Sequence, residues 1–598
     1  MEKSIPLTVY QQRISDLTID RNQLKKKRSI ISWLRFAAII VIIASFYYLK
    51  PYGLLYAFGS AIFFIALFLR LVILSARNND KISNLDLLLT VNQQELDIAS
   101  GKYNDLPGGT EHLPPLHDYA QDLDIFGRAS LYQYINRTTS EQGHKTLASW
   151  LLQPSPATEI IERQEGAKEL SNQYQWRQQL QAYGLANKVT ISTEQRIDNW
   201  LKEDNRFAAA HWKWLRYIFP AIILSALVCT LIGLLPSELF WGMFFIFLVI
   251  ALAISKMVVP VYLQLDKIVK QAETLSNSLA WIEQQPFQTN LLKELQANYK
   301  IGSSYSSKEV VALKDILARF DLRLNPILFI FLNTLLFWDL QQVLQLEKWK
   351  ERNAKNVESW FNTLGTIEAL GSIGAIFFNH PDWNFPLLDK KEGTFIADEL
   401  GHPLIPAGKR VCSSFATSGT AKLALITGSN MAGKSTFLRS VGVNIVLAMM
   451  GAPVCAKSFT VSNMRVISSM RIADNLEENT STFYAELKKL KYIIEAVNNQ
   501  EKVFLLLDEI LRGTNSLDRQ QGSKALIRQL IRHQAVGMLA THDLELANLI
   551  QDYPDNIHNY HFDVQVDNEE LYFDYKLKEG VCQSLNASIL MKKIGIEL

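Results

Sequence analysis

A glycine-bounded segment in the last third of the chain has the spacing of a phosphate-binding loop. Residues 423–436 read LALITGSNMAGKST, and two glycines enclose four residues before a Lys-Ser pair. In such a loop the backbone N–H groups surround phosphate oxygens, the lysine reaches the outer phosphates, and the serine hydroxyl binds Mg²⁺. The residues expected to bind the nucleotide are Gly428, Ser429, Asn430, Met431, Ala432, Gly433, Lys434, Ser435 and Thr436. We therefore expect ATP and Mg²⁺ as the ligands of this segment.

Two further apolar runs end in residues that suit hydrolysis. The run VFLLL ends in Asp508 and Glu509, and the run VGMLA ends in Thr541 and His542. We expect Asp508 to hold Mg²⁺ with Ser435, Glu509 to activate the attacking water, and His542 to sense the γ-phosphate or that water. Alone, the carboxylates could simply end a strand, and the histidine could be a cap or a solvated side chain. Beside the glycine loop, both are better interpreted as catalytic residues.

These residues must be positioned by a parallel sheet. The apolar runs 423–426, 503–507 and 536–540 are short enough for buried strands, and an apolar helical stretch over 437–450 follows the loop. The carboxyl ends of parallel strands meet at one edge of a sheet, where ligands of open α/β sheets bind. The sequence therefore predicts a C-terminal α/β domain over residues 391–598.

Two pairs of apolar segments precede this domain. Residues 51–69 and 217–237 carry no charge, and each is about as long as the ~20 residues that cross a bilayer. Because each has an apolar partner across a short turn, we expect two transmembrane hairpins, at about 32–50 with 54–76 and about 215–235 with 239–259. The alternative is a pair of wholly buried core hairpins.

Basic residues flank both hairpins on their outer sides. Before the first hairpin lie Arg21, Lys25, Lys26, Lys27 and Arg28, whereas the connecting turns hold one lysine and one glutamate. The positive-inside rule then places the N-terminus and every domain in the cytoplasm. We expect a multi-pass protein of the cytoplasmic (inner) membrane, with residues 1–110 forming a basic N-terminal segment and the first hairpin.

The middle of the chain, residues 111–390, is expected to be a helical core interrupted by the second hairpin. Its residues 261–362 have few glycines and apolar positions at helical spacing. The apolar stretch 327–340 is too short to span a membrane. A basic cluster could touch phosphate but is better interpreted as a solvated helix face; it comprises Lys348, Lys350, Arg352 and Lys355.

Bulk composition adds little about partners. With 61 Lys plus Arg against 59 Asp plus Glu, no strong global charge attracts nucleic acid. The four cysteines have no paired spacing, so we interpret them as reduced thiols rather than as disulfides or zinc ligands. No zinc finger or other independent DNA-reading motif is present.

The motifs together resemble the MutS family of DNA mismatch-repair ATPases. The resemblance is carried by TGSNMAGKSTFLRSV with MMGAPVCA downstream, by DEILRGTNSLDRQQG (508–522), by THDLEL (541–546) and by the tail over 575–596. The segment DNLEENTSTFYAEL (474–487) is similar to the loop that reaches across to a partner's nucleotide in this family and in ABC-type ATPases. The resemblance implies that Ser481 acts in trans in a homodimer formed through the ATPase domains, and that double-stranded DNA is a partner. Alone, Ser481 and Thr482 would be an ordinary helix N-cap pair.

The likeness extends upstream and also has gaps. Residues 123–170 resemble the start of the family's helical core domain, and residues 367–388 resemble its end. Ser429 and Ala432 replace the family's usual Pro and Gly, and Gly401-His402-Pro403 lacks the usual preceding Arg. The N-terminal mismatch-reading and connector domains are missing, and the second hairpin stands where the family has lever helices and a DNA clamp.

The predicted fold class is therefore multi-domain: membrane α-helical hairpins, an all-α core or lever domain, and a C-terminal α/β P-loop ATPase domain of the ABC type. We expect a membrane-anchored ATPase that couples ATP binding and hydrolysis to the binding of mismatched or aberrant DNA in repair. One alternative is an ABC-like transport ATPase. Two observations oppose it: four spans in two separated hairpins would make a thin permeation path, and no Leu-Ser-Gly-Gly signature occurs before Asp508. Another is a membrane scaffold without a DNA role, which the intact set of site residues opposes.

Overall fold

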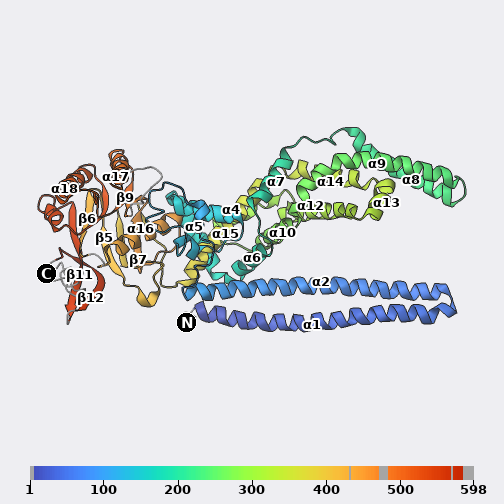
Figure 1. Cartoon of the computed structure of the whole chain (residues 1–598), viewed down its shortest axis with the longest axis horizontal. Helices are drawn as coiled ribbons and strands as arrows, with labels where there is room; N and C mark the ends of the chain where they lie inside the picture. Colours follow the sequence, from blue (N-terminus) through green and yellow to red (C-terminus); the bar gives the residue numbers. More distant parts are fainter. Residues whose placement is uncertain (1–5, 430–431, 471–481, 568–569, 583–598) are drawn as a thin grey trace.

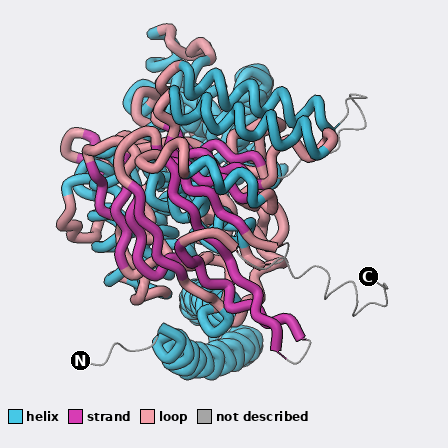
Figure 2. The backbone as a smooth tube through the Cα atoms, turned by 90° about the vertical axis from the view of Figure 1, so that its left-hand side faces the viewer, coloured by secondary structure: helices cyan, strands magenta, loops and turns pink. Residues whose placement is uncertain are grey.

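The computed structural model describes residues 6–429, 432–470, 482–567 and 570–582, and the chain they form is multi-domain and mostly helical with an α/β C-terminal region. A domain built on β-sheets lies at one end, a helical core lies in the middle, and two helical arms extend side by side toward the other end (Figure 1). Viewed from the sheet end, the strands lie in front and the first arm is seen along its helix axes (Figure 2).

The first arm is an antiparallel pair of long helices, α1 (Pro6–Leu49) and α2 (Leu54–Ala99). They are joined by the short helix η1 (Lys50–Tyr52) and by Gly53, whose φ of 128° favours glycine. Toward the turn the arm exposes large apolar side chains, such as Leu55 (84%) and Ile62 (67%). Both helices continue past the expected spans of 32–50 and 54–76, and their extensions carry the polar residues that pack against the core.

The core and the second arm contain the remaining helices of the central region. The core helices are α3 (Leu131–Ile135), α4 (Glu141–Leu152), α5 (Ala157–Asn172), α6 (Tyr174–Ala186), α7 (Ile191–Lys202), α10 (Val269–Glu283), α11 (Asn290–Ala297), α12 (Ser306–Phe320), α14 (Trp338–Asn353) and α15 (Val357–Asn379). The second arm consists of α8 (Ala210–Leu231), α9 (Ser237–Leu265) and α13 (Pro326–Leu336). Short 3₁₀ helices and a small hairpin lie between them: η2 (Thr110–His112), η3 (Asp266–Ile268), η4 (Asp321–Leu324), β1 (Lys300–Ile301) and β2 (Ser304–Tyr305).

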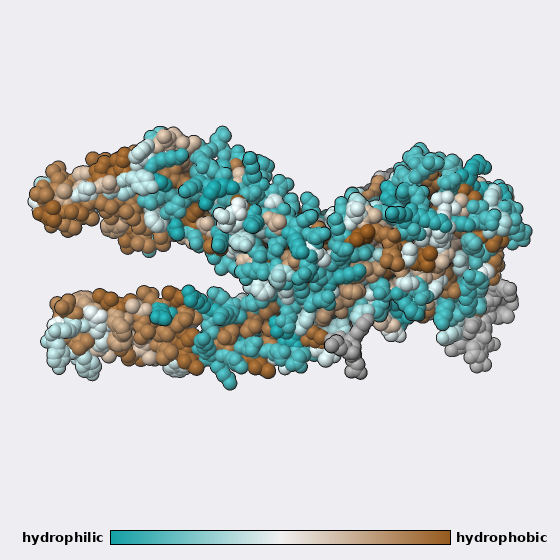
Figure 3. All heavy atoms as spheres, turned by 180° about the vertical axis from the view of Figure 1, so that it is seen from behind, coloured by the Kyte–Doolittle hydropathy of each residue, from teal (hydrophilic) through white to brown (hydrophobic). Residues whose placement is uncertain are grey.

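Apolar surface gathers at the free ends of both arms. The space-filling view shows the two apolar ends at the same end of the molecule, with open space between the arms (Figure 3). Among the described residues, five helices are long and apolar enough to cross a membrane, or six if the bent pair α13–α14 counts as one. One of the five, α15, is a core helix, because 72% of its most apolar stretch is buried, against 6–33% in the four helices of the arms.

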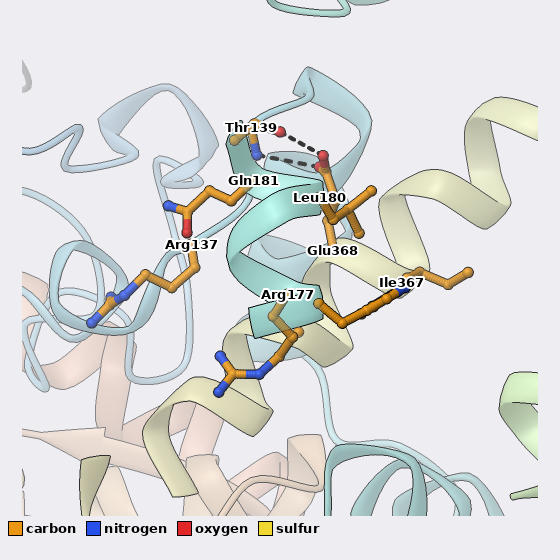
Figure 4. Close-up of a pocket in the computed structure, with 9 residues that line it drawn as sticks. Arg137, Thr139, Arg177, Leu180, Gln181, Ile367 and Glu368 are labelled. Atoms are coloured by element: carbon orange, nitrogen blue, oxygen red, sulfur yellow. Dashed lines mark hydrogen bonds between the residues drawn. The ribbon is translucent and has the colours of Figure 1, made fainter. Parts of the chain in front are cut away.

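The first arm is fixed to the core by buried polar contacts at its base. The Arg137 guanidinium donates to both carboxylate oxygens of Glu95 at 2.6 and 3.0 Å, and Asn379 donates to Glu95 at 2.8 Å. Nearby, Arg137, Arg177 and Glu368 line a cavity of about 20 Å³, which has room for about one water molecule (Figure 4). Bidentate buried pairs of this kind fix orientation as well as position.

The basic cluster on α14 differs in part from the sequence-based expectation. Lys350 is only 9% exposed, and its ammonium group donates to the backbone carbonyls of Trp200 and Glu203 at 2.7 and 2.5 Å. The prediction of a solvated face was therefore wrong for this residue, because α7 packs over it.

The C-terminal region contains two sheets. Its strands are β3 (Leu387–Asp389), β4 (Phe395–Leu400), β5 (Ser413–Thr417), β6 (Lys422–Thr427), β7 (Ser458–Ser462), β8 (Arg465–Ser469), β9 (Val503–Asp508), β10 (Val536–Thr541), β11 (Ile557–Asp567) and β12 (Glu570–Glu579). Its helices are η5 (Ala407–Lys409), α16 (Lys434–Met450), α17 (Thr482–Asn498), α18 (Ser516–Arg532) and η7 (Leu544–Ile550). The six-stranded sheet has the order β12-β11-β6-β10-β9-β8, and all neighbouring pairs are parallel except β11 with β12. The second sheet has the order β3-β7-β4-β5.

Both faces of the six-stranded sheet are covered, which explains its continuous apolar strands. On β6, Ala424 and Ile426 face the core that contains α16, whereas Leu423 and Leu425 face α17 and α18. This alternation follows the two-residue period of a strand. The sheet therefore delivers the residues that follow β6, β9 and β10 to one edge.

Candidate active site

The glycine loop joins β6 to α16, as the spacing predicted. Gly428 has φ of 150°, and a Cβ atom there would meet the carbonyl oxygen of Phe562 at 2.9 Å. Gly433 has φ of 109° and lies against Tyr575. Both glycines are therefore required by backbone conformation and by close approach to the strands β11 and β12. The candidate residues Asn430 and Met431 lie outside the described residues.

Lys434 lies at the first position of α16 and turns back over the loop. Its ammonium group donates to the carbonyl oxygens of Gly428 at 2.7 Å and Ser429 at 2.9 Å, and the residue is 4% exposed. Burial lowers the pKa of Lys434, and the nearby carboxylates of Glu509 and Asp508 oppose that shift. Its charge is thus held against the loop at the N-terminus of a helix, an arrangement that suits phosphate.

The two predicted metal ligands are in direct contact. The Ser435 hydroxyl donates to the Asp508 carboxylate at 2.6 Å, and Asp508 is 7% exposed. Burial raises the pKa of Asp508, and the hydrogen bond from Ser435 opposes that shift. Among the described residues no group of three or more His, Cys, Asp or Glu side chains could hold a metal alone. A hydroxyl and a carboxylate fit Mg²⁺, which keeps waters and takes its other oxygens from phosphates.

Glu509 follows β9 in a conformation that few non-glycine residues adopt. Its φ is 51°, and its N–H donates to the carbonyl of Ala540 on β10 at 2.9 Å. Its carboxylate lies 3.5 Å from His542 Nδ1 and 3.3 Å from Arg512 Nε. Strained backbone at a strand end is common where a side chain must be held in position. The tips of β9 and β10 thus bring Glu509 and His542 together.

Arg512 is a site residue that the sequence analysis did not identify. It donates to the carbonyl oxygens of Asp508 and Glu509, each at 3.0 Å, besides its ion pair with Glu509. The backbone of the same turn is held by α17, because the buried Glu486 carboxylate accepts the N–H groups of Leu511 and Arg512. The position of Arg512, four residues after Asp508 in DEILRGT, was the only available signal.

A cavity of about 700 Å³ opens beside the loop. Its polar wall includes Ser429, Lys434, Ser435, Thr436, Glu509 and Arg512, and its other walls include Leu400, His402, Ile405, Lys409, Val411, Phe562 and Tyr575. The lining therefore combines charged and hydroxyl groups with apolar and aromatic side chains. A ligand with a charged tail and a flat apolar head would match both kinds of side chain.

Most of the expected residues meet at this cavity or beside it. Lys434, Ser435, Asp508, Glu509 and His542 come together through the contacts above. Ser481, expected to act in trans, lies outside the described residues. Among the described residues, which include all four cysteines, no disulfide is formed.

The C-terminal region is similar in sequence to known proteins. The family model of MutS domain V matches residues 424–593. The chain is 33% identical over 205 residues to human MutS protein homolog 4, a match that covers 32% of this chain and 22% of that protein. It is 30% identical over 206 residues to the Arabidopsis thaliana DNA mismatch repair protein MSH4, covering 34% of this chain and 26% of that protein. The mouse MutS protein homolog 4 is 33% identical over 196 residues, a match that covers 31% of this chain and 20% of that protein. The chain thus matches about a quarter or less of the length of these relatives.

Proposed function

This chain belongs to the MutS family through its C-terminal MutS domain V, and from that membership we propose that it is a membrane-anchored ATPase that couples ATP binding and hydrolysis to DNA binding in repair. The observation that carries the proposal is the meeting of three strand ends. The ends of strands β6, β9 and β10 bring Lys434, the Ser435–Asp508 pair and the Glu509–His542 pair to one edge of the sheet.

Each residue of this edge has a defined part in hydrolysis. The loop N–H groups and Lys434 bind the β- and γ-phosphates, and Ser435 and Asp508 hold Mg²⁺, which when bound neutralises phosphate charge. Glu509 accepts a proton from the attacking water, and His542 donates to that water or to the γ-phosphate. Arg512 holds Glu509 and the end of β9 in place. Positioning and electrostatic stabilisation supply most of the rate enhancement in this chemistry.

The apolar part of the cavity lining suits the base of the nucleotide. Phe562, Tyr575, Ile405 and Val411 all line the cavity that also contains the loop residues. A planar base gains from stacking and burial between such side chains. This arrangement supports a nucleoside triphosphate over free phosphate as the ligand.

DNA and a second subunit are the proposed partners. One of the relatives, from Arabidopsis thaliana, is named as a DNA mismatch repair protein, and the match to MutS domain V supports a double-stranded DNA partner for this chain. We propose a homodimer formed through domain V, in which Ser481 reaches the partner's γ-phosphate.

Membrane attachment is proposed from the two arms. They project in the same direction and carry their exposed apolar ends at one level (Figure 3). The first arm continues into the basic stretch Lys25–Arg28 on the side of the core, in keeping with a cytoplasmic core at the inner membrane. The open space between the arms opposes the transport alternative, because no single bundle encloses a path.

The first test is ATP hydrolysis by the full chain in liposomes. Glu509→Gln should lower kcat by about 100-fold or more, since general-base catalysis contributes about that much. Lys434→Ala should cost at least as much through lost phosphate binding. The matched control is Glu545→Gln, which changes an exposed carboxylate (62%) of the same domain. Wild-type turnover in Glu509→Gln would remove the assigned base.

The second test is DNA binding. Gel-shift assays measure the affinity of the protein for matched, mismatched and branched duplexes, with and without ATP. A salt series then gives the electrostatic contribution to DNA binding. A preference that changes with ATP supports the proposed coupling. Equal, weak binding to all three duplexes would contradict the repair role while leaving ATP hydrolysis intact.

A further inference from the structure

The short helix α13 does not belong to the helical core, although it follows α12 in the chain. It contains no charged residue, and its sequence is PILFIFLNTLL. Large apolar side chains on and just before it are exposed, including Leu324 (68%), Ile327 (68%), Phe331 (49%) and Leu328 (42%). An apolar surface of this size is not explained by the core.

The contacts of α13 show how far along the second arm it reaches. Before it, Arg323 donates to Ser255 of α9 at 2.9 Å, and Ser255 donates to Asp339 at the start of α14 at 2.8 Å. Within it, the ring of Phe331 lies 6.2 Å from that of Phe244 of α9. Phe244 lies eleven residues closer to the free end of α9 than Ser255, or about 16 Å along a helix. The chain therefore enters at the level of Ser255, advances toward the free end of the arm, and returns to the same level.

The return is a sharp bend with its polar backbone groups satisfied. The axes of α13 and α14 differ by 76°, and Phe337 at the bend has φ of 49°. Asn333 accepts the N–H of Asp339 at 2.9 Å, and Gln341 donates to the carbonyl of Leu336 at 2.7 Å. At the start of α13, the Asn325 side chain accepts the N–H groups of Ile327 and Leu328. Broken helices are tolerated at membrane depth only when such groups are paired within the protein.

The entry level coincides with the charged end of the apolar stretch of α9. Ser255 is followed by Lys256, the first charged residue after a run that begins at Leu239. On that level lie Arg323 and Asp339, with side chains 12% and 1% exposed and 3.5 Å apart. The polar cluster thus marks the boundary beyond which residues 239–254 of α9 and the whole of α13 expose only apolar side chains.

We propose that α13 is a re-entrant half-span whose exposed face contacts lipid acyl chains of the leaflet nearest the core. The proposal rests on the membrane placement of α8 and α9. Helix α13 packs against both of these helices, and its contact with Phe244 lies about 16 Å along α9 beyond the polar cluster, about half of the ~30 Å hydrocarbon core of a bilayer. The arm then enters the membrane as three segments, and the Arg323–Ser255–Asp339 cluster fixes the third segment to the second.

Site-directed spin labelling of the full chain in liposomes tests this. In a Cys229→Ser, Cys412→Ser background, Phe331→Cys is the test position and Leu328→Cys is a second one in case the first variant misfolds. Val249→Cys on α9 (52% exposed) is the bilayer reference, and Val311→Cys on α12 (39% exposed) is the aqueous reference. The collision rates of each label with oxygen and with a polar nickel chelate are measured.

The ratio of oxygen to nickel accessibility should be about tenfold higher at positions 331 and 249 than at 311, because oxygen concentrates in hydrocarbon and the chelate is excluded. A label at position 331 that meets nickel as readily as one at 311, with position 249 protected, would overturn the half-span and leave membrane anchoring intact. Shielding from both reagents at 331 would also overturn it and indicate a second copy or another protein on this face. Nickel access at 249 would overturn both proposals.

Discussion

Arg512 offers the sharpest test of how the site is held together. Its guanidinium makes two hydrogen bonds of 3.0 Å to the carbonyls of Asp508 and Glu509, and an ion pair of 3.3 Å to the Glu509 carboxylate. It touches the end of β9 and its acidic side chain, so it acts as a positioning residue. Among the described residues, replacing it with alanine leaves the Glu509 carboxylate with the 3.5 Å contact to His542 as its remaining ion pair.

The size of the effect follows from these contacts. Hydrogen bonds from a charged donor contribute about 1.5–3 kcal/mol each. Arg512 is 42% exposed, so solvent screening reduces the total for its contacts to about 1.5–3 kcal/mol. If the loss falls on the alignment of Glu509, kcat should fall by about 10- to 150-fold. Lysine at this position should recover only part of the activity, since it cannot span both carbonyls and the carboxylate.

The assay is steady-state ATP hydrolysis of Arg512→Ala and Arg512→Lys, with kcat and KM determined separately. The loss should lie mainly in kcat. Arg528→Ala is the matched control, because Arg528 is an arginine of similar exposure (49%) whose ion pair with Asp552 lies away from the site. A kcat of Arg512→Ala within twofold of wild type, or an equal loss in Arg528→Ala, would refute the reasoning.

Two further predictions concern protonation and burial. Because burial lowers the pKa of Lys434, its amine should lose its proton at a pH below ~10.4, the pKa of an exposed lysine. The affinity for ATP should therefore weaken as the pH rises toward that value. A dissociation constant for ATP that stays unchanged between about pH 8 and about pH 10 in equilibrium binding would contradict this. Glu368 accepts hydrogen bonds from the N–H and hydroxyl groups of Thr139 (Figure 4) and from those of Ser140. Glu368→Leu leaves these donors unpaired and should destabilise the chain by about 2–6 kcal/mol, whereas Glu368→Gln should cost less. Equal melting temperatures for the two variants in detergent would argue against the assigned role.

The local part of the site could be predicted from the sequence because its signals are short-range. The strand, glycine loop and helix occur as expected, with β6 ending at Thr427 and α16 beginning at Lys434. A run of apolar residues followed by Asp508 likewise predicted β9. The roles assigned to the side chains at these ends remain predictions until hydrolysis is measured.

Long-range contacts were beyond sequence reasoning. Tyr575 reaches the loop only because β12 pairs with β11, and the pairing depends on how a distant strand adds to the sheet. The burial of Lys350 depends on α7, far away in sequence. That the stretch over 327–340 is too short to span stays a prediction, and its contacts with α9, which place it along the arm, depend on residues far away in sequence.

The polar half of α2 has a consequence for the electrostatics of the nucleotide site. From Asn78 to Ala99 the helix continues for 22 residues without a break, or about 33 Å. If the apolar half lies in a bilayer, the core packs beside this rod, and the nucleotide site beyond its far end lies several Debye lengths from the headgroups (Figure 1), since that length is about 8 Å at physiological salt. Anionic lipids would then leave the affinity for a negatively charged nucleotide unaltered, and the bilayer would serve to hold the enzyme in place without tuning its ligand.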